Sequence, residues 1–175
     1  MAREIALTKG MVALVDDEDG YLDGQAWLAH LQMWKTYAAR GQWNGTRVET
    51  ILMHRVILGA GPSDHVDHIN GDTLDNRRSN LRLCTRSQNA ANAKVRTDGV
   101  SRFKGVSLDK RCPRKPWRAT IVVNRRQRGL GYYATEQEAA AAYDAAAQAA
   151  FGEFAHGNGM LGAAQDEAGK ATPGP

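Results

Sequence analysis

The chain has 175 residues, 42% of them hydrophobic, which is typical of a soluble globular protein with one ordinary domain or two small ones. No run of about 18 apolar residues occurs, and the N-terminus lacks the apolar core of a secretory signal, so we expect no membrane span and a cytoplasmic location. Two distant cysteines, Cys84 and Cys112, predict neither a disulfide framework nor a structural zinc site.

The net charge of +4 is spread unevenly along the chain. Residues 1–50 carry −2, residues 51–100 carry +2, residues 101–135 carry +9 and residues 136–175 carry −5. A dense basic block of this kind attracts phosphate backbones and indicates a nucleic-acid partner. A solvated basic surface is the alternative, and charge alone does not decide between the two.

Short apolar stretches separated by turn signals fill the first half of the chain. Residues 4–8 and 11–15 read as strands that the acidic residues 16–20 bring to an end, and residues 48–58 are apolar enough for a buried element. We expect the N-terminal strands and nearby aromatic residues to form a platform beside the polar segment that follows. Core packing is the alternative for these aromatic residues, and we favour it for the first of them. The aromatic residues are Trp27, Trp34 and Tyr37.

After the polar segment, residues 81–85 read as a short strand, and Thr85 or Ser87 can cap a helix over about residues 88–94. A linker at 98–100 precedes a second pattern. That pattern predicts strands at 103–108, 117–123 and 128–134, and then an alanine-rich helix to about residue 150. Thr135 and Glu138 have the spacing of a capping box at the start of this helix. The predicted packing face of the helix consists of Ala139, Ala142, Tyr143, Ala146 and Ala150. Residues 158–175 are expected to be disordered.

The polar segment, residues 66–81, has the residue types that phosphodiester hydrolysis requires. An imidazole titrates near neutral pH and suits a general base, which predicts that role for His68. Carboxylate and amide oxygens suit a hard Mg²⁺ or Mn²⁺ ion, and Asp67, Asn80 and Asn89 offer them. Asp67 and His68 are adjacent, so on a regular strand their side chains point to opposite faces, and both reach one site only if the strand bends.

This constellation resembles the HNH homing endonucleases of phages and mobile introns. The resemblance covers about residues 50–95 and is carried by His54-Arg55, Val66-Asp67-His68-Ile69-Asn70-Gly71-Asp72, Leu74-Asp75-Asn76, Asn80-Leu81-Arg82 and Asn89. It implies a ββα-metal fold in which His68 is the general base and Asn80 holds the catalytic loop together. Asp67 and Asn89 would be the protein ligands of one divalent cation, Mg²⁺ or Mn²⁺. His54 lies in an apolar stretch and is at least as well explained as a core histidine.

Residues 101–156 resemble an APETALA2/ethylene-response-factor domain, which lays a three-stranded antiparallel sheet, packed on one helix, in the major groove of DNA. Phe103-Lys104-Gly105-Val106-Ser107, Trp117-Arg118-Ala119, residues 130–140, residues 142–146 and Phe151-Gly152 carry this resemblance. Strand alternation puts Trp117, Ala119, Ile121 and Val123 on the helix side and Arg118 on the DNA side. We expect Lys104, Arg126 and Arg128 to contact DNA near Arg118. Base specificity is not carried over, because Ser107, Thr120, Val122 and Gly129 depart from the family pattern.

Together these features predict an α+β protein with an N-terminal ββα-metal nuclease domain (1–97), a linker (98–100), a sheet-and-helix DNA-binding domain (101–157) and a disordered tail (158–175). The predicted function is metal-dependent hydrolysis of double-stranded DNA in a bacterial or phage-infected cytoplasm. A single HNH motif favours nicking by a monomer, or cutting of both strands by a weak dimer. A non-catalytic DNA-binding regulator with a decayed nuclease fold is the alternative, and an RNA-binding module is a third interpretation based on charge alone.

Overall fold

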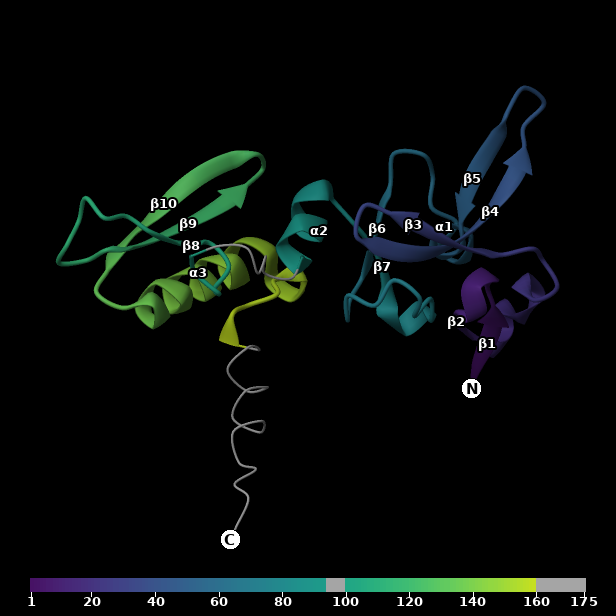
Figure 1. Cartoon of the computed structure of the whole chain (residues 1–175), viewed down its shortest axis with the longest axis horizontal. Coiled ribbons are helices and arrows are strands. Elements are labelled where there is room, and N and C mark those ends of the chain that lie inside the picture. Colours follow the sequence, from purple (N-terminus) through teal and green to yellow (C-terminus); the bar gives the residue numbers. More distant parts are fainter. Residues whose placement is uncertain (94–99, 160–175) are drawn as a thin grey trace, which may run out of the picture. The chain divides into compact units, whose positions relative to one another are not determined.

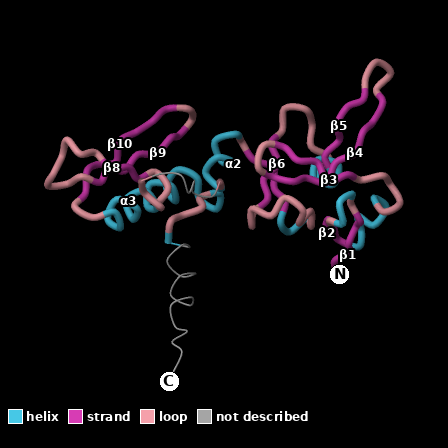
Figure 2. The backbone as a smooth tube through the Cα atoms, viewed as in Figure 1, coloured by secondary structure: helices cyan, strands magenta, loops and turns pink. Residues whose placement is uncertain are grey.

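The computed structural model describes residues 1–93 and 100–159 of a mixed α/β chain (Figure 1). The chain divides into two compact units, Met1–Asn89 and Ala90–Pro175. The predicted linker at 98–100 lies mostly outside the described residues, so its boundaries stay a prediction. Each unit has its own small sheets, as the secondary-structure colours show (Figure 2). Each unit also has its own core of buried apolar residues.

The first unit opens with two antiparallel sheets, where alternating apolar residues give each strand one buried side. The first sheet is a hairpin of β1 (Ala2–Ala6) and β2 (Val12–Asp16). Between these strands lies the short 3₁₀ turn η1 (Thr8–Gly10), and the predicted acidic turn is the 3₁₀ helix η2 (Asp17–Leu22). The second sheet has the order β3 (Leu28–Gln32), β4 (Lys35–Trp43) and β5 (Val48–Leu52).

The single buried element predicted at 48–58 is wrong, because the stretch divides into β5 and the helix α1 (Met53–Leu58). Gly59 ends α1 in the left-handed conformation, with φ of 60°. The hairpin of β6 (His65–His68) and β7 (Leu81–Cys84) follows, and then the helix α2 (Arg86–Asn92). Thr85 caps α2, because its hydroxyl accepts from the Gln88 N–H while the Gln88 amide oxygen accepts from the Thr85 N–H. Lys94, the predicted end of this helix, lies outside the described residues.

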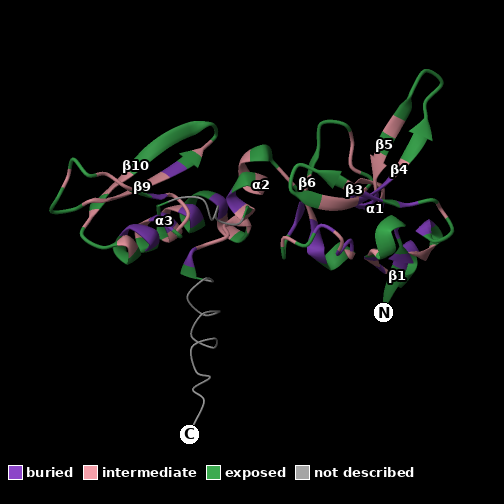
Figure 3. Cartoon of the chain, viewed as in Figure 1, coloured by how far each residue is buried: buried purple, intermediate pink, exposed green. Residues whose placement is uncertain are grey.

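The core of the first unit packs the two N-terminal sheets, α1 and β7 around fully buried apolar side chains (Figure 3). Trp27 is 3% exposed, and its indole N–H donates to the Leu22 carbonyl at 2.9 Å, which confirms the core role favoured for it. Trp34 is 92% exposed, so core packing is excluded for that residue. The members of the cluster are Ile5, Leu7, Ala13, Val15, Leu22, Trp27, Ala29, Ala38, Met53, Ile57 and Leu81.

The second unit is an antiparallel sheet of order β10-β9-β8 packed against one long helix. Its elements are β8 (Val106–Leu108), β9 (Trp117–Val123), β10 (Arg126–Tyr133), α3 (Glu136–Phe151) and the 3₁₀ turn η4 (Gly152–Phe154). The bounds of β9 and the Thr135–Glu138 capping box are as predicted. Gly105 lies beneath the ring of Tyr143, where a Cβ would come within 2.0 Å of ring carbon Cδ2, so only glycine fits.

Four details of the second unit differ from prediction. The first strand begins at Val106 rather than at residue 103, and β10 begins at Arg126. Ala150, predicted to pack, is exposed, and the buried end of the helix face is Phe151. The disordered tail predicted from 158 is wrong at its start, because Asn158 is 3% exposed and its N–H donates to Asp144 at 2.7 Å. Residues 160–175 lie outside the described part of the chain.

Within residues 1–93 and 100–159, none of the helices has the length and apolar character needed to cross a bilayer.

Candidate active site

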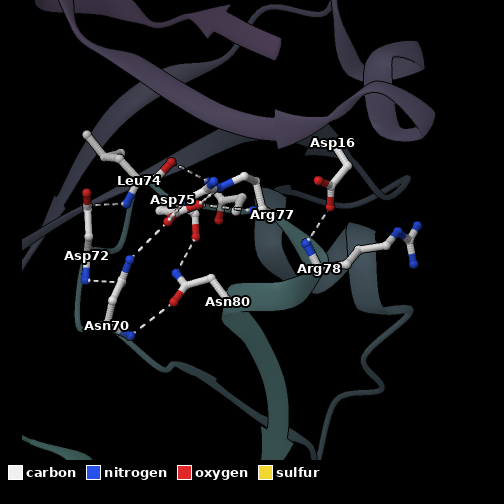
Figure 4. Close-up of polar contacts among 9 residues, drawn as sticks. Asp16, Asn70, Asp72, Leu74, Asp75, Arg77, Arg78 and Asn80 are labelled. Carbon is white, nitrogen blue, oxygen red and sulfur yellow. Dashed lines mark hydrogen bonds and ion pairs between the residues drawn. The ribbon is translucent and has the colours of Figure 1, made fainter. Parts of the chain in front are cut away.

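The loop between β6 and β7 is closed by hydrogen bonds that converge on Asn80 (Figure 4). The Asn80 side-chain amide donates to the Asp75 carbonyl at 2.8 Å, and its oxygen accepts from the Asn70 N–H at 3.0 Å. The Asn70 amide donates in turn to the Asp75 carboxylate at 2.9 Å. Arg77 pairs with that carboxylate and holds the pKa of Asp75 below its usual range, mainly through side-chain hydrogen bonding. A loop of this length therefore has a fixed shape without regular secondary structure.

Strand β2 anchors the same loop to the N-terminal hairpin. The Leu14 N–H donates to the Leu74 carbonyl at 2.9 Å, and the Asn76 N–H donates to the Leu14 carbonyl at 2.7 Å. The end of β2 and the 3₁₀ helix η2 bind Arg78 of the loop: its N–H donates to Asp16, and its guanidinium pairs with Asp19, which is 0% exposed. The N-terminal strands thus support the polar loop.

His68 ends β6 and is 5% exposed. Its Nε2 lies 3.3 Å from Oδ1 of Asn76, a residue that is 1% exposed. Around the ring lie Tyr37 of β4, at 6.3 Å between ring centroids, and His54 of α1, at 5.1 Å and edge-on. His54 and Tyr37 are themselves 5.6 Å apart. The three aromatic rings and Asn76 form one group, which we call the His68 cluster.

The contacts of Asn76 indicate which nitrogen of His68 carries the proton. Nδ2 of Asn76 donates to the Leu74 carbonyl at 3.2 Å, and a carbonyl can only accept. The amide oxygen of Asn76 therefore faces His68, and it requires a hydrogen on Nε2. In the neutral ring this leaves the lone pair on Nδ1.

Burial favours the neutral form of both histidines in the cluster. Desolvation, the neighbouring His68 and Arg55 together lower the pKa of His54 to about 3. Desolvation also lowers the pKa of His68, although the hydrogen bond to Asn76 and the charges of Asp67 and Asp72 oppose that shift. His54 is 6% exposed on α1, which fits the interpretation as a core histidine.

Asp67, next to His68 on β6, forms an ion pair with a residue of β7. It lies opposite Arg82 in the β6–β7 register, and the Arg82 guanidinium donates to its Oδ2 from Nε at 2.9 Å and from Nη2 at 2.8 Å. Asp67 is 4% exposed, so this is a buried ion pair. Pairing between β6 and β7 is continuous at Asp67 and His68, and the carboxylate of Asp67 bonds Arg82 while the ring of His68 bonds Asn76.

Asn89 lies on α2, with its N–H bonded to the Thr85 carbonyl at 3.0 Å. Burial, with the charge of Asp67 adding to it, raises the pKa of the Cys84 thiol to about 11, while the Asn89 backbone acts on the same thiol in the opposite direction. In the register, Asp67 lies opposite Arg82 and so two residues from Cys84 along the same hairpin. The carboxylate and amide oxygens of Asp67 and Asn89 are the donor types that a hard divalent cation prefers, so the residues present fit such an ion.

The four predicted DNA contacts of the second unit do not share one face. Lys104 donates its ammonium to the carbonyls of Ala90, Ala91 and Ala93 at the end of α2, and desolvation lowers its pKa to about 8. Arg118 pairs with Tyr132 in the sheet register and lies 5.9 Å from the centroid of that ring, on the side away from α3.

Cross-strand partners share a face of a sheet, so the register also places the other two arginines. Arg126 lies opposite Val123 and Arg128 opposite Ile121, and both of those β9 residues belong to the core under the sheet. Arg126 and Arg128 are exposed at the edge strand but project from the α3 side. Of the four residues, Arg118 is the one placed on the open face.

Several residues around the site were given no role from sequence. Asn76 and Arg82 lie within the HNH pattern but have no role of their own in it, and Tyr37 is expected in the aromatic platform. Arg82 had a detectable signal, because pairing β6 with β7 from the loop ends places it opposite Asp67. The His68 contacts of Asn76 and Tyr37 depend on how the loop and β4 fold over the strand, which no local pattern encodes.

Comparisons with known proteins point to the same segment. Residues 52–91 match a family model described as HNH endonuclease, so this stretch carries an HNH endonuclease domain. The chain is 38% identical over 104 residues to an uncharacterized HNH endonuclease of Acanthamoeba polyphaga mimivirus, which covers 59% of this chain and 52% of the relative. It is 35% identical over 63 residues to Protein 3.8 of Escherichia phage T7, covering 36% of this chain and 50% of that protein. The chain spans about half the length of the curated relatives it matches.

Proposed function

We propose that the protein is a metal-dependent endonuclease that hydrolyses phosphodiester bonds in double-stranded DNA, with β6, β7 and α2 forming a ββα-metal site. The observation that carries this proposal is the placement of His68. It ends β6, within the segment that matches the HNH family model, and Asn76 orients its ring from a loop that Asn80 closes. Such a fixed imidazole is what a general base requires.

In the proposed reaction, Nδ1 of His68 takes a proton from the water that attacks the phosphorus atom. The lowered pKa of His68 keeps the ring neutral at neutral pH and therefore able to accept that proton. Asn76 holds the ring through Nε2, so the acceptor nitrogen keeps its direction as the proton arrives. The carbonyl and carboxylate of Asp75 contribute indirectly, because they fix Asn80 and Asn70 in the loop.

Asp67 and Asn89 would hold the divalent cation, Mg²⁺ or Mn²⁺, which when bound offsets the charge on the transition state and on the leaving oxygen. Arg82 already neutralises part of the Asp67 charge. It also fixes the direction of the carboxylate, as outer partners of metal ligands commonly do.

The second unit would bind the DNA, as an APETALA2/ethylene-response-factor-like sheet on a helix. Arg118 is the proposed central contact, because it lies on the open face of β9 with Thr120 and Val122. Arg126 and Arg128 would reach phosphates from the sheet edge. Lys104 stays a prediction, since a DNA contact would require it to leave the α2 carbonyls. The sequence carries a single HNH motif, which favours nicking by a monomer.

Conversion of supercoiled plasmid to nicked circles in Mg²⁺ or Mn²⁺ tests the proposal. We expect the wild-type chain to nick, and His68→Ala and His68→Gln to leave the plasmid intact. His65→Ala is the matched control, because His65 lies on the same strand but is exposed, and this variant should nick like the wild type. Thermal unfolding confirms that each variant is folded. Absence of product from the wild type, or equal cutting by both His68 variants, would overturn the proposal.

Asn76 sharpens this test, because its proposed role is to position His68. Asn76→Asp keeps an oxygen for Nε2, whereas Asn76→Leu does not, and both lose the amide bond to Leu74. We expect both variants to lose similar stability but Asn76→Leu to have a kcat about tenfold or more below that of Asn76→Asp, since one hydrogen bond to a charged group contributes about 1.5–3 kcal/mol. Equal kcat values for the two variants contradict a positioning role.

A non-catalytic DNA-binding regulator is the second candidate. The observation favouring it is that the proposed metal ligand and general base are both occupied or buried: Asp67 is paired with Arg82, and His68 is 5% exposed. It predicts tight DNA binding by the wild type without any nicked product in either metal.

A further inference from the structure

The turn between β3 and β4 is unusual in its chemistry. Gln32 and Lys35 pair in the register, so only Met33 and Trp34 connect the two strands. Two-residue hairpin turns usually need glycine or asparagine where φ is positive, yet Met33 has φ of 56°. Met33 is 83% exposed and Trp34 is 92% exposed. The turn therefore exposes two large apolar side chains to water, and one of them, Met33, has a backbone conformation that non-glycine residues disfavour. Backbone strain of this kind clusters at functional sites.

The same hairpin is attached to the candidate active site. The Thr73 hydroxyl, in the β6–β7 loop, donates to the Thr36 carbonyl at 2.6 Å. Tyr37, one residue further along β4, belongs to the His68 cluster. Alternate residues of a strand share a face, so Lys35 projects from β4 on the same side as Tyr37. The positive charge of Lys35 is also among the influences that lower the pKa of His68.

We propose that Met33, Trp34 and Lys35 form the contact by which the nuclease unit grips its DNA strand beside His68. In this contact Trp34 and Met33 pack against a base or deoxyribose, and Lys35 pairs with a phosphate next to the cleaved one. The inference rests on the proposed function and names a substrate contact for that same site.

The combination of side chains favours nucleic acid over a second copy of this chain or another protein. Exposed apolar side chains can insert between the base steps of a duplex or pack on a deoxyribose, and a lysine next to them has the sign that a phosphate requires. The other large exposed apolar residues of β3 and β4 are Leu28, Leu31 and Trp43, spread along both strands rather than gathered at the turn. A self-association surface would gain nothing from Lys35 at its centre.

The test uses the full-length chain and a short duplex that contains a mapped nick site. Trp34→Ala and Lys35→Gln should each lower kcat/KM about tenfold, mainly through KM, without lowering the melting temperature, because both side chains are exposed. Met33→Gly should raise the melting temperature, because glycine accepts a positive φ, and yet lower kcat/KM. Trp43→Ala is the matched control, an exposed tryptophan (63%) on the other end of β4, and should cut like the wild type.

Tryptophan fluorescence gives a readout that does not depend on cutting. Addition of the duplex with EDTA should quench emission in the wild type and in Trp43→Phe, and the quenching should be lost in Trp34→Phe. Wild-type cleavage by Trp34→Ala and Lys35→Gln, with undiminished quenching in Trp34→Phe, overturns the contact but leaves the nuclease proposal intact. Quenching at Trp34 without any cleavage supports the contact and rejects the nuclease. If the molecular mass of the wild type in solution rises with protein concentration, and that of Trp34→Ala does not, the turn mediates self-association and the DNA contact is overturned.

Discussion

The two compact units place their polar side chains in opposite ways. The first unit buries an unusual number of charged and amide groups, whereas in the described part of the second unit the buried polar residues are Ser101 and Asn158. The buried polar set of the first unit is Asp19, His54, Asp67, His68, Thr73, Asp75, Asn76 and Asn80. The second unit instead carries most of its basic charge on the surface.

This difference suits the two units to different functions, a rigid polar site in the first and charged surface contacts in the second. Buried polar groups must be satisfied by fixed partners, and the result is a rigid arrangement of the sort that catalysis uses. Exposed arginines keep their hydration and mobility, and they suit backbone contacts that need charge more than geometry. Substitution of one polar side chain in the first unit should therefore have a large effect on stability and cleavage, and a comparable substitution in the second unit should have a small effect on DNA binding.

The largest effect is expected from Asn80→Ala. It leaves the Asn70 N–H and the buried Asp75 carbonyl without the Asn80 side chain, at a cost of about 2–4 kcal/mol in unfolding free energy, and nicking should be lost with the loop shape. Chemical denaturation and the plasmid assay measure the two quantities.

Asn44→Ala is the control for Asn80. Asn44 also uses its side chain to bond Thr46, Arg47 and Glu49 in a turn, but it is exposed. Water replaces its lost bonds, so its cost should stay below about 1 kcal/mol. Equal costs for the two variants would show that burial is not what makes the polar loop rigid.

A second effect concerns acid stability of the first unit. The pKa of His54 falls from 6.5 to about 3 on folding, so below pH 6.5 the unfolded chain binds a proton that the folded chain does not. Above pH 6.5 His54 is neutral in both states and does not lower the free energy of unfolding. As the pH falls from 6.5 toward 3, protonation of His54 in the unfolded chain lowers the free energy of unfolding by an amount on the order of a few kcal/mol.

His54→Phe should flatten this pH dependence, because it keeps an aromatic ring and removes the titrating group. Thermal unfolding between pH 3.5 and 7.5, at about half-unit steps, measures the slope. Ile57→Val on the same helix is the control, because it weakens the core without removing an ionisable group, and it should keep the wild-type slope. An unchanged slope in His54→Phe would place the acid-sensitive group elsewhere.

How far the sequence predicted this structure depends on whether the determining interactions are local. The bounds of β9 follow from the strong β propensity of its run of β-branched residues, and the start of α3 follows from the hydroxyl and carboxylate of its capping box. These interactions join residues at most a few positions apart. For the candidate site, the residues in the HNH pattern indicated the segment that the family model also matches.

What the sequence could not predict depends on contacts across strands and loops. The division of 48–58 into β5 and α1 was missed because a short, largely apolar stretch suits a strand and a helix equally well, and periodicity does not separate the two. The faces of Arg126 and Arg128 depend on register. Asn124 and Arg125 both have positive φ and form a two-residue turn, and a turn one residue longer would move both arginines to the other side of the sheet.

The smallest predicted effect tests that register and the surface character of the second unit. Arg118→Ala should weaken DNA binding by about 1 kcal/mol and lower the slope of log K against log salt by about 0.9, the value for one phosphate contact. Arg128→Ala removes the same charge from the α3 side of the edge strand, so it should change both quantities less. Fluorescence anisotropy with a labelled duplex at several salt concentrations compares the two. Because both variants have the same net charge, a loss as large for Arg128→Ala as for Arg118→Ala would mean that charge alone governs binding and that the open face of the sheet has no special role.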